Sequence, residues 1–213
     1  MSKFVILLGG TVVPTKRLQD QVSGARVIAA DSGMAHAATL DLEPELWVGD
    51  FDSSHSALQK THAHVPRQTF PAEKDATDGE LAIAEAMRRG ATELVLVGGF
   101  GGQFDHALAH AGFLIALERR GMKIFMSSGN EEAHPLGSTL FLNTLLPGTR
   151  LSIVPMSDLK ALTVTGVKWP LNRRDVPLGS ALTLSNVVVG PVNIELRFGA
   201  ALVLIYPNTQ GMT

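Results

Sequence analysis

Short apolar runs alternate with stretches of helical period up to roughly residue 128, and this alternation restricts the possible folds more than any other feature. The apolar runs predict strands at residues 3–8, 26–30, 46–48, 93–97 and 123–126. The stretches between them predict helices at residues 33–40, 54–60, 77–89 and 105–120. Apolar strands separated by helices predict an α/β fold, a mainly parallel sheet with helices on both faces. Ligand chemistry is then expected at the carboxyl ends of the strands.

The pattern changes after about Gly129, where β-branched or alternating segments are separated by Pro and Gly and no convincing helix remains. The predicted strands are at residues 151–156, 160–167, 180–189, 192–198 and 201–206. This half is expected to be an antiparallel β-sandwich, with a small barrel as the alternative. We therefore predict two domains, residues 1–135 and residues 136–213.

Composition excludes several classes of protein. The 213 residues are 45% hydrophobic and 18% charged, which indicates a globular chain rather than a disordered one. Lys and Arg number 18 against 20 Asp and Glu, without a long basic run, so nucleic acid is not the expected partner. No apolar stretch approaches the ~18 residues of a membrane span. The absence of cysteine excludes disulfides and thiolate metal sites, and we expect a cytoplasmic protein.

An acidic turn follows the third predicted strand. In the segment LWVGDFDSS, Gly49 permits a tight turn, and Asp50 and Asp52 lie two positions apart. If this segment is extended, both carboxylates leave on one side while Phe51 leaves on the other. Two carboxylates at the end of a strand suit Mg²⁺, which is commonly held by one or two acids together with substrate phosphates. The alternative is that both residues simply turn the chain and cap the next helix.

A second acidic motif stands in the segment PAEKDATDGELAIAEAM. Thr77 and Glu80 fit a capping box, which places Asp78 in the first turn of an amphipathic helix. Asp75 and Asp78 supply metal ligands and Lys74 supplies a counter-charge for phosphate, at a helix end that favours anions. The alternative is that acids at this position only complement the helix dipole.

The third motif is LVLVGGFGGQFDHALAHAGF, in which a buried strand leads through four glycines to Asp105 and His106 at the start of a helix. Such a loop lets backbone N–H groups approach a polyphosphate closely, although it matches neither the P-loop nor the dinucleotide-binding pattern. All three motifs follow predicted strands, so a parallel sheet would gather them in one crevice. Carboxylates gathered there repel one another unless cations join them. The histidines, including His36, are expected to be structural.

At these motifs the sequence resembles the thiamine pyrophosphokinase family, whose members move a diphosphate from ATP to thiamine. The segments that carry the resemblance are AADSG (29–33), GDFDS (49–53), EKDATDGELA (73–82), GGFGGQFDH (98–106), TGVKWPL (165–171) and LSN (184–186). The resemblance therefore spans nearly the whole chain in the family's order.

The resemblance implies an N-terminal domain that binds ATP, a C-terminal β-sandwich, and a homodimer that holds thiamine between subunits. The residues that it implies around Mg²⁺ and the reacting groups are Asp50, Asp52, Asp78 and Asp105. The residues that it implies on the ATP side are Asp31, Lys74, Asp75, Gly101, Gly102 and Gln103. Those that match the thiamine pocket are Trp169, Ser185 and Asn186, where a flat aromatic ring can stack on a pyrimidine.

Four positions depart from the family's pattern. Gln103 stands where the family usually has Arg, which removes a cation from beside the polyphosphate. The other departures are Ser32 for Gly, His110 for Asn and Val187 for an acid. No carboxylate is lost, so we expect an active enzyme.

The implied reaction is attack of a primary alcohol on the β-phosphorus of ATP, with AMP as the leaving group. Such a transfer depends on charge neutralisation and in-line positioning, and Asp78 and Asp105 are both candidates to accept the alcohol's proton. Two alternatives stay open at this point. The acceptor could be a pterin or another hydroxymethyl heterocycle, or the chain could be a non-catalytic sensor of nucleotide or thiamine diphosphate.

Overall fold

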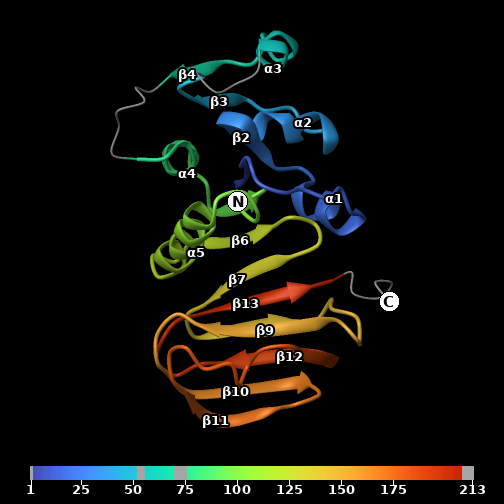
Figure 1. Ribbon diagram of the computed structural model, residues 1–213, viewed down its shortest axis with the longest axis vertical. Coiled ribbons are helices and arrows are strands. Elements are labelled where there is room, and N and C mark those ends of the chain that lie inside the picture. The colour runs from blue at the N-terminus through green and yellow to red at the C-terminus, as the bar shows by residue number, and fades with distance from the viewer. Residues whose placement is uncertain (1, 52–55, 70–75, 208–213) are drawn as a thin grey trace. The chain divides into compact units, whose positions relative to one another are not determined.

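The computed structural model describes residues 2–51, 56–69 and 76–207, which form two units (Figure 1). The first unit consists of the described residues of Met1–Leu108 together with Met122–Gly129. The second unit consists of Ala109–Gly121 together with the described residues of Asn130–Thr213.

Over its described residues, the first unit contains a parallel sheet in the order β4-β3-β2-β1-β5-β6. Its strands are β1 (Lys3–Leu7), β2 (Arg26–Ala30), β3 (Leu46–Gly49), β4 (Arg67–Thr69), β5 (Glu93–Val97) and β6 (Lys123–Ser127). The chain moves outward from β1 to β4 and then returns to place β5 on the other side of β1. The parallel sheet predicted from the apolar runs is confirmed.

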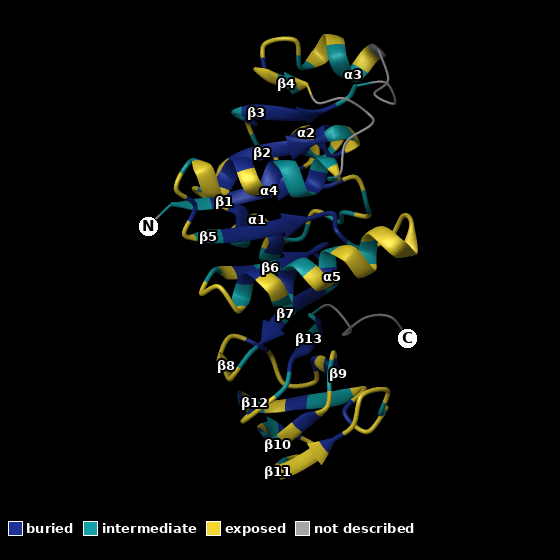
Figure 2. Ribbon diagram, turned by 90° about the vertical axis from the view of Figure 1, so that its left-hand side faces the viewer, coloured by how far each residue is buried: buried dark blue, intermediate teal, exposed yellow. Residues whose placement is uncertain are grey.

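The helical elements are α1 (Lys16–Val22), η1 (Asp31–Met34), α2 (Ala35–Thr39), α3 (Ser56–Thr61), α4 (Asp78–Arg88) and α5 (Phe104–Glu118). Leu18 and Val22 of α1 and Ala37 of α2 pack in one apolar cluster with Val5 and Leu7 of the central strand β1. Helix α4 contacts β1, β2 and β3 and lies on the opposite side of the sheet (Figure 1). Helices therefore cover both faces, as predicted, and the central strands are buried on both sides (Figure 2).

Two elements of the first unit were not predicted. Helix α1 reads KRLQDQV and buries only Leu18 and Val22, so its apolar period is weak. It begins because the Thr15 side chain accepts a hydrogen bond from the backbone N–H of Leu18, at 3.2 Å. Strand β4 has only three residues, RQT, and its hydrogen bonds to β3 rather than its composition define it.

The second unit is antiparallel over its described residues. Its strands are β7 (Glu132–Leu136), β8 (Thr139–Leu142), β9 (Arg150–Pro155), β10 (Leu159–Val167), β11 (Leu171–Val176), β12 (Asn186–Glu195) and β13 (Ala201–Tyr206). One sheet has the order β7-β13-β9-β12, and the other joins β8, β12, β10 and β11. Buried side chains from both sheets form one apolar core. This is the predicted β-sandwich arrangement.

Strand β12 belongs to both sheets, and here the sequence-based prediction was partly wrong. Residues 186–189 and 192–195 were predicted in separate strands, but β12 runs continuously through Gly190 and Pro191. Its first residues pair with β9 and its last residues pair with β8 and β10. Gly166 permits the close approach of β10 to β12 at this point, because a Cβ there would lie 2.0 Å from the Pro191 carbonyl oxygen.

Residues 180–185, also predicted as strand, form turns instead. Strand β11 was missed because its sequence, LNRRDV, is polar and mostly exposed (Figure 2). None of the helices among the described residues is long and apolar enough to cross a membrane.

Candidate active site

Two glycine-containing loops meet at the carboxyl ends of β1 and β5, where the strand order of the sheet reverses. The N–H of Gly10 donates to the carbonyl of Gly98 at 2.8 Å, and the N–H of Thr11 donates to the carbonyl of Phe100 at 2.7 Å. A Cβ on Gly10 would lie 2.2 Å from the Phe100 oxygen, so the loops approach too closely for a side chain. Ligands of open α/β sheets bind at this kind of reversal point.

His36 supports the first of these loops. Its Nε2 lies 2.9 Å from the carbonyl oxygen of Gly10, and because a carbonyl can only accept, Nε2 carries the hydrogen. Burial lowers the pKa of His36, and the hydrogen bond to Gly10 partly opposes this shift. A neutral His36 therefore holds the loop after β1 at physiological pH.

Sequence reasoning missed Gly9, Gly10 and His36 as parts of the site. Gly9 is less restricted, because a Cβ there would lie 2.2 Å from the hydroxyl oxygen of Ser32, a side-chain atom that can rotate away. A glycine pair directly after a buried first strand was the signal available in the sequence.

Asp31 and Asp50 lie at the carboxyl ends of neighbouring strands, β2 and β3. Ala30 pairs with Val48, and a Cβ on Gly49 would lie 3.5 Å from the Cα of Asp31. Both aspartates are half-buried. Asp31 has a φ of 43°, an unfavourable value for a residue with a Cβ. The buried Trp47 stabilises this conformation by donating from Nε1 to the Asp31 carbonyl at 2.8 Å.

The turn after Asp50 corrects one expectation. Phe51 has a φ of 64°, so the segment is not extended there and the two-residue alternation does not orient its carboxylates. The Phe51 ring instead packs edge-on against Trp47, with centroids 5.0 Å apart. Arg67 lies over both rings and donates to the Gln59 carbonyl at 2.8 Å. Asp52 lies outside the described residues.

The predicted capping box at the start of α4 is confirmed. The Glu80 N–H donates to the Thr77 hydroxyl at 3.2 Å, and the Thr77 N–H donates to the Glu80 carboxylate at 2.8 Å. Asp78 is therefore the first residue of α4 and is half-buried. Lys74 and Asp75 lie outside the described residues.

The glycine loop after β5 ends in an exposed segment. Gly101 and Gly102 have φ values of 74° and 69°, and a Cβ on Gly102 would meet no atom within 4 Å. Gln103 and Asp105 are exposed, and the Asp105 carboxylate accepts from the N–H of His106 at 2.9 Å. The backbone of this loop is therefore open to a ligand. Among the described residues, no three His, Asp or Glu side chains are grouped closely enough to hold a metal ion by themselves.

In the second unit, two of the three predicted thiamine-side residues contact each other directly. The Trp169 N–H donates to Oδ1 of Asn186 at 3.1 Å, and Nδ2 of Asn186 donates to the Trp169 carbonyl at 2.8 Å. Trp169 remains 55% exposed, with the Lys168 ammonium 4.8 Å from its ring centroid. Ser185 lies beside them, but its N–H donates to the Ser152 hydroxyl at 2.9 Å.

Trp169 and Asn186 line a pocket of about 210 Å³. The other lining residues are mostly apolar: Leu151, Ile153, Val164, Leu171, Leu182 and Thr183. Such a pocket suits a flat, weakly polar ring. Ser185 is not among its lining residues.

Two family models match the chain, in the order in which the two units occur. Residues 19–126 match "Thiamin pyrophosphokinase, catalytic domain", which covers half of the chain. Residues 140–203 match "Thiamin pyrophosphokinase, vitamin B1 binding domain". The chain belongs to the thiamin pyrophosphokinase family. Enzymes of this family transfer pyrophosphate from ATP to thiamine, and the chain is therefore an ATP-dependent pyrophosphokinase.

Individual thiamin pyrophosphokinases agree with this membership. The thiamine pyrophosphokinase of Bacillus subtilis (strain 168) is 29% identical over 167 residues, covering 76% of this chain and 78% of that protein. The crystal structure of the Bacillus subtilis enzyme superposes with a TM-score of 0.85 at 24% identity, over 97% of this chain and 100% of that one. A family protein from Enterococcus faecalis gives 0.83 at 23% identity, over 98% and 100% of the two chains. These structures show a shared fold.

Proposed function

We propose that the carboxyl end of the parallel sheet binds ATP, and that Asp50, Asp52, Asp78 and Asp105 form the acidic catalytic set. The strongest support is the pair of backbone hydrogen bonds that joins the glycine loops after β1 and β5. The half-buried Asp31 and Asp50 lie at the same edge of the sheet. We assign residues 1–135 to ATP and residues 136–213 to thiamine. Both family models describe thiamin enzymes, which favours thiamine over a pterin or another heterocycle as acceptor.

The chain's own groups would bind and orient the phosphates. Gly101 and Gly102 allow a phosphate to approach the backbone, and Asp31, Lys74, Asp75 and Gln103 would surround the nucleotide. A carboxylate within hydrogen-bond reach would accept the proton of the attacking hydroxyl, and Asp78 and Asp105 remain the candidates. Most of the catalytic effect would come from holding alcohol and phosphorus in line.

Mg²⁺ fits the donors present. Asp50 directly follows β3 and Asp78 begins α4, both half-buried, and carboxylate oxygens are the hard ligands that this ion prefers. Mg²⁺ commonly takes the rest of its coordination from phosphates and water. We propose that Asp50, Asp52, Asp78 and Asp105 would hold it. When bound, the ion would neutralise charge on the phosphates.

We propose that the thiamine pyrimidine ring stacks on Trp169 in the 210 Å³ pocket. Asn186 uses Oδ1 to accept from both Trp169 and Val187, and it donates one of its two Nδ2 hydrogens to Trp169. Its main role is therefore to fix the backbone beneath the ring, with one hydrogen left for the ligand. Ser185 would act through the backbone beside the pocket.

A homodimer would cover apolar side chains near this pocket. Leu178, Leu182 and Leu184 are 62%, 55% and 45% exposed, and all lie in the segment between β11 and β12. Exposed apolar side chains gathered in one segment are typical of an interaction surface. We propose a second copy of the chain as the partner. Sedimentation of the wild type as a dimer, and of Leu182→Glu as a monomer, would support this; a wild-type monomer with full activity would refute it.

The reaction is tested by incubating the protein with ATP and thiamine and measuring AMP. We expect AMP and thiamine diphosphate in equal amounts, and no product when EDTA removes divalent ions. A hydroxymethylpterin in place of thiamine should give no AMP. Equal or faster turnover of the pterin would overturn the acceptor assignment.

The thiamine pocket is tested with Trp169→Ala. We expect the KM for thiamine to rise about tenfold while the KM for ATP changes little, because a stacked ring contributes about 1 kcal/mol beyond its buried area. Trp169→Phe should recover most of the loss. The matched control is Phe141→Ala, which removes another exposed aromatic ring from the second unit, 59% exposed, away from the pocket. A rise in the KM for ATP instead would contradict the assignment.

A further inference from the structure

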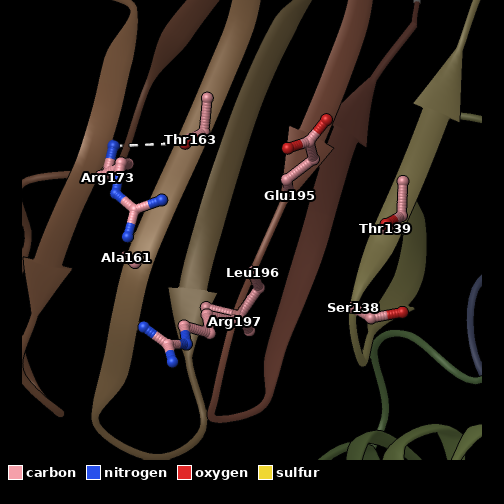
Figure 3. A pocket seen from close by; sticks show the side chains of 8 residues that line it. All are labelled: Ser138, Thr139, Ala161, Thr163, Arg173, Glu195, Leu196 and Arg197. Carbon is pink, nitrogen blue, oxygen red and sulfur yellow. Dashed lines mark hydrogen bonds between the residues drawn. The ribbon is translucent and has the colours of Figure 1, made fainter.

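A second hollow lies in the second unit, on the outer face of the sheet formed by β8, β12, β10 and β11. It has a volume of about 280 Å³ and shares no lining residue with the Trp169 pocket. In Figure 3 the side chains of Arg173 and Arg197 lie toward one end and Thr139 and Glu195 toward the other. We call this hollow the arginine groove.

The strand register explains why these polar side chains share a face. Thr163 of β10 pairs with Glu195 of β12, and Glu195 pairs with Thr139 of β8. Their sequence neighbours Leu162 and Ile194 are fully buried in the core, so the three polar residues face outward. The backbone N–H of Arg173 donates to the Thr163 hydroxyl at 3.2 Å, which brings β11 into the same row.

Two left-handed residues shape the arginine groove. Ala161 and Arg173 have φ values of 54° and 48°, and each interrupts the regular pairing of β10 with β11. Asp175 holds the first of them, because its carboxylate accepts from the Ala161 N–H at 3.0 Å and from Lys160 at 2.9 Å. The small side chain of Ala161 leaves the space into which both guanidinium groups extend (Figure 3).

The two arginines of the groove differ from the neighbouring Lys160 in their pairing. Among the described residues, neither Arg173 nor Arg197 has an ion pair, in contrast to the neighbouring Lys160, which is paired with Asp175. The Arg197 guanidinium rests over the Phe198 ring, 5.3 Å from its centroid, which limits the orientations that it samples. Glu195 already accepts from the amide of Asn193 at 2.9 Å. The groove therefore presents two guanidinium groups that can donate hydrogen bonds to an anion, and one carboxylate that can accept a hydrogen bond.

We propose that the arginine groove binds the phosphoryl group of a small phosphate-bearing ligand between Arg173 and Arg197. Guanidinium groups match phosphate oxygens in paired hydrogen bonds, and two of them compensate a doubly charged phosphate. Glu195 accepts a hydrogen bond or a positive charge from the rest of the ligand. The site is separate from the pocket and loops assigned to the reaction, and it does not depend on that assignment.

The proposal is tested by titrating the full-length protein with inorganic pyrophosphate and following the Nε–Hε signals of Arg173 and Arg197 by NMR. These signals report on the groove itself, so binding of pyrophosphate at the nucleotide site does not interfere. We expect both signals to shift in a saturable way. Arg173→Gln should weaken the binding that Arg197 reports by about tenfold or more. The matched control is Arg174→Gln, the next residue of β11, which does not line the groove.

Absence of a saturable shift would overturn the proposal. An equal loss of affinity in Arg174→Gln would also overturn it, because the binding would then reflect general positive charge and not the groove. Folding is checked with Arg173→Gly, which suits a positive φ. We expect this variant to melt no lower than the wild type and still to lose the binding. A variant that retains the binding would also overturn the proposal.

Thiamine diphosphate and AMP are then compared with pyrophosphate in the same titration. Tighter binding of either organic phosphate, with the advantage lost in Glu195→Gln, would support the role given to Glu195. Equal binding of all three in the wild type would show that Glu195 takes no part and would overturn that role.

Discussion

The two ends of the parallel sheet differ, because one carries a network of ion pairs and the other carries backbone in unfavourable conformations. At the amino end, Arg26 starts β2 and donates to Glu45 at 2.8 and 2.7 Å. Arg88 and Arg89, at the end of α4, donate to Glu85 at 2.7 Å, and Arg89 also reaches Glu45. Every charge in this network has a protein partner, and the network joins β2, β3 and α4.

At the carboxyl end, where we propose that ATP binds, the backbone has unfavourable conformations instead. Asp31 and Phe51 adopt left-handed backbone conformations, and Gly10 and Gly98 approach at distances that exclude side chains. Residues held in such conformations reduce stability and persist where the surrounding structure enforces them, often at functional sites. The comparison teaches that one end of the sheet stabilises the fold, while the other has unfavourable backbone conformations at the place where we propose that ATP binds.

The largest expected effect comes from Asp50→Asn, which removes a carboxylate from the carboxyl end of the sheet. We expect activity to fall roughly 10²–10³-fold, because one group that stabilises the transition state is lost. Stability should hold or rise, since a carboxylate is removed from among other acids. Steady-state kinetics and thermal melting check both expectations. Asp41→Asn, at an exposed turn, is the control and should change neither. A loss of activity that only follows a lower Tm would favour a turn-forming role.

The next largest effect is expected from Glu85→Gln, which removes the carboxylate that Arg88 and Arg89 share at the amino end of the sheet. Hydrogen bonds from Arg88 and Arg89 lower the pKa of Glu85 from 4.5 to about 2, against the opposing effect of burial. A lowered pKa means that Glu85 stabilises the fold above pH ~4.5 and loses this contribution as the pH falls toward 2. At pH 7 we expect the variant to lose about 2 kcal/mol of unfolding free energy, a Tm decrease of roughly 4–8 °C.

Melting curves between pH 7 and pH 2 check this expectation, and the difference between wild type and variant should narrow as the pH falls. Turnover per folded molecule should be unchanged. Glu43→Gln is the control, because the Glu43 side chain is 91% exposed and contributes little. A difference that widened at low pH would contradict the role given to the network.

The smallest effect is expected from Gln103→Arg, which would sharpen the comparison by adding a cation to the carboxyl end. Gln103 is exposed, so we expect ATP to bind only about two- to fivefold tighter. Gln103→Lys should give less, because an ammonium cannot bind two phosphate oxygens in a forked arrangement. Unchanged KM for ATP in both variants would mean that Lys74 or another cation already fills this position. Arg67 is a weaker candidate for that cation, because it already contacts Gln59 and the rings of Trp47 and Phe51.

Much of the fold followed from local pattern. The apolar runs marked the strands β1, β2, β3, β5 and β6 because these strands are buried on both faces. Thr77 and Glu80 marked the start of α4, since a capping box needs only residues three apart. Helix α1 and strands β4, β7, β8 and β11 were not predicted. For α1, β4 and β11 the reason is that a short polar segment has no apolar period of its own, and its hydrogen bonds to neighbouring elements define it.

For the candidate site, too, some features were readable from the sequence and others only from the structure. The sequence by itself determined the family, the α/β order and the aspartates after the strands, because these are readable over a few adjacent residues. Only the tertiary structure decided that Gly10 must lack a side chain, that Phe51 turns under Trp47, and that Asn186 holds the backbone of Trp169. The partners of Gly10 and Asn186 lie 88 and 17 residues away in the chain, at Gly98 and Trp169. Contacts between distant segments depend on strand register and close packing, which no local pattern specifies.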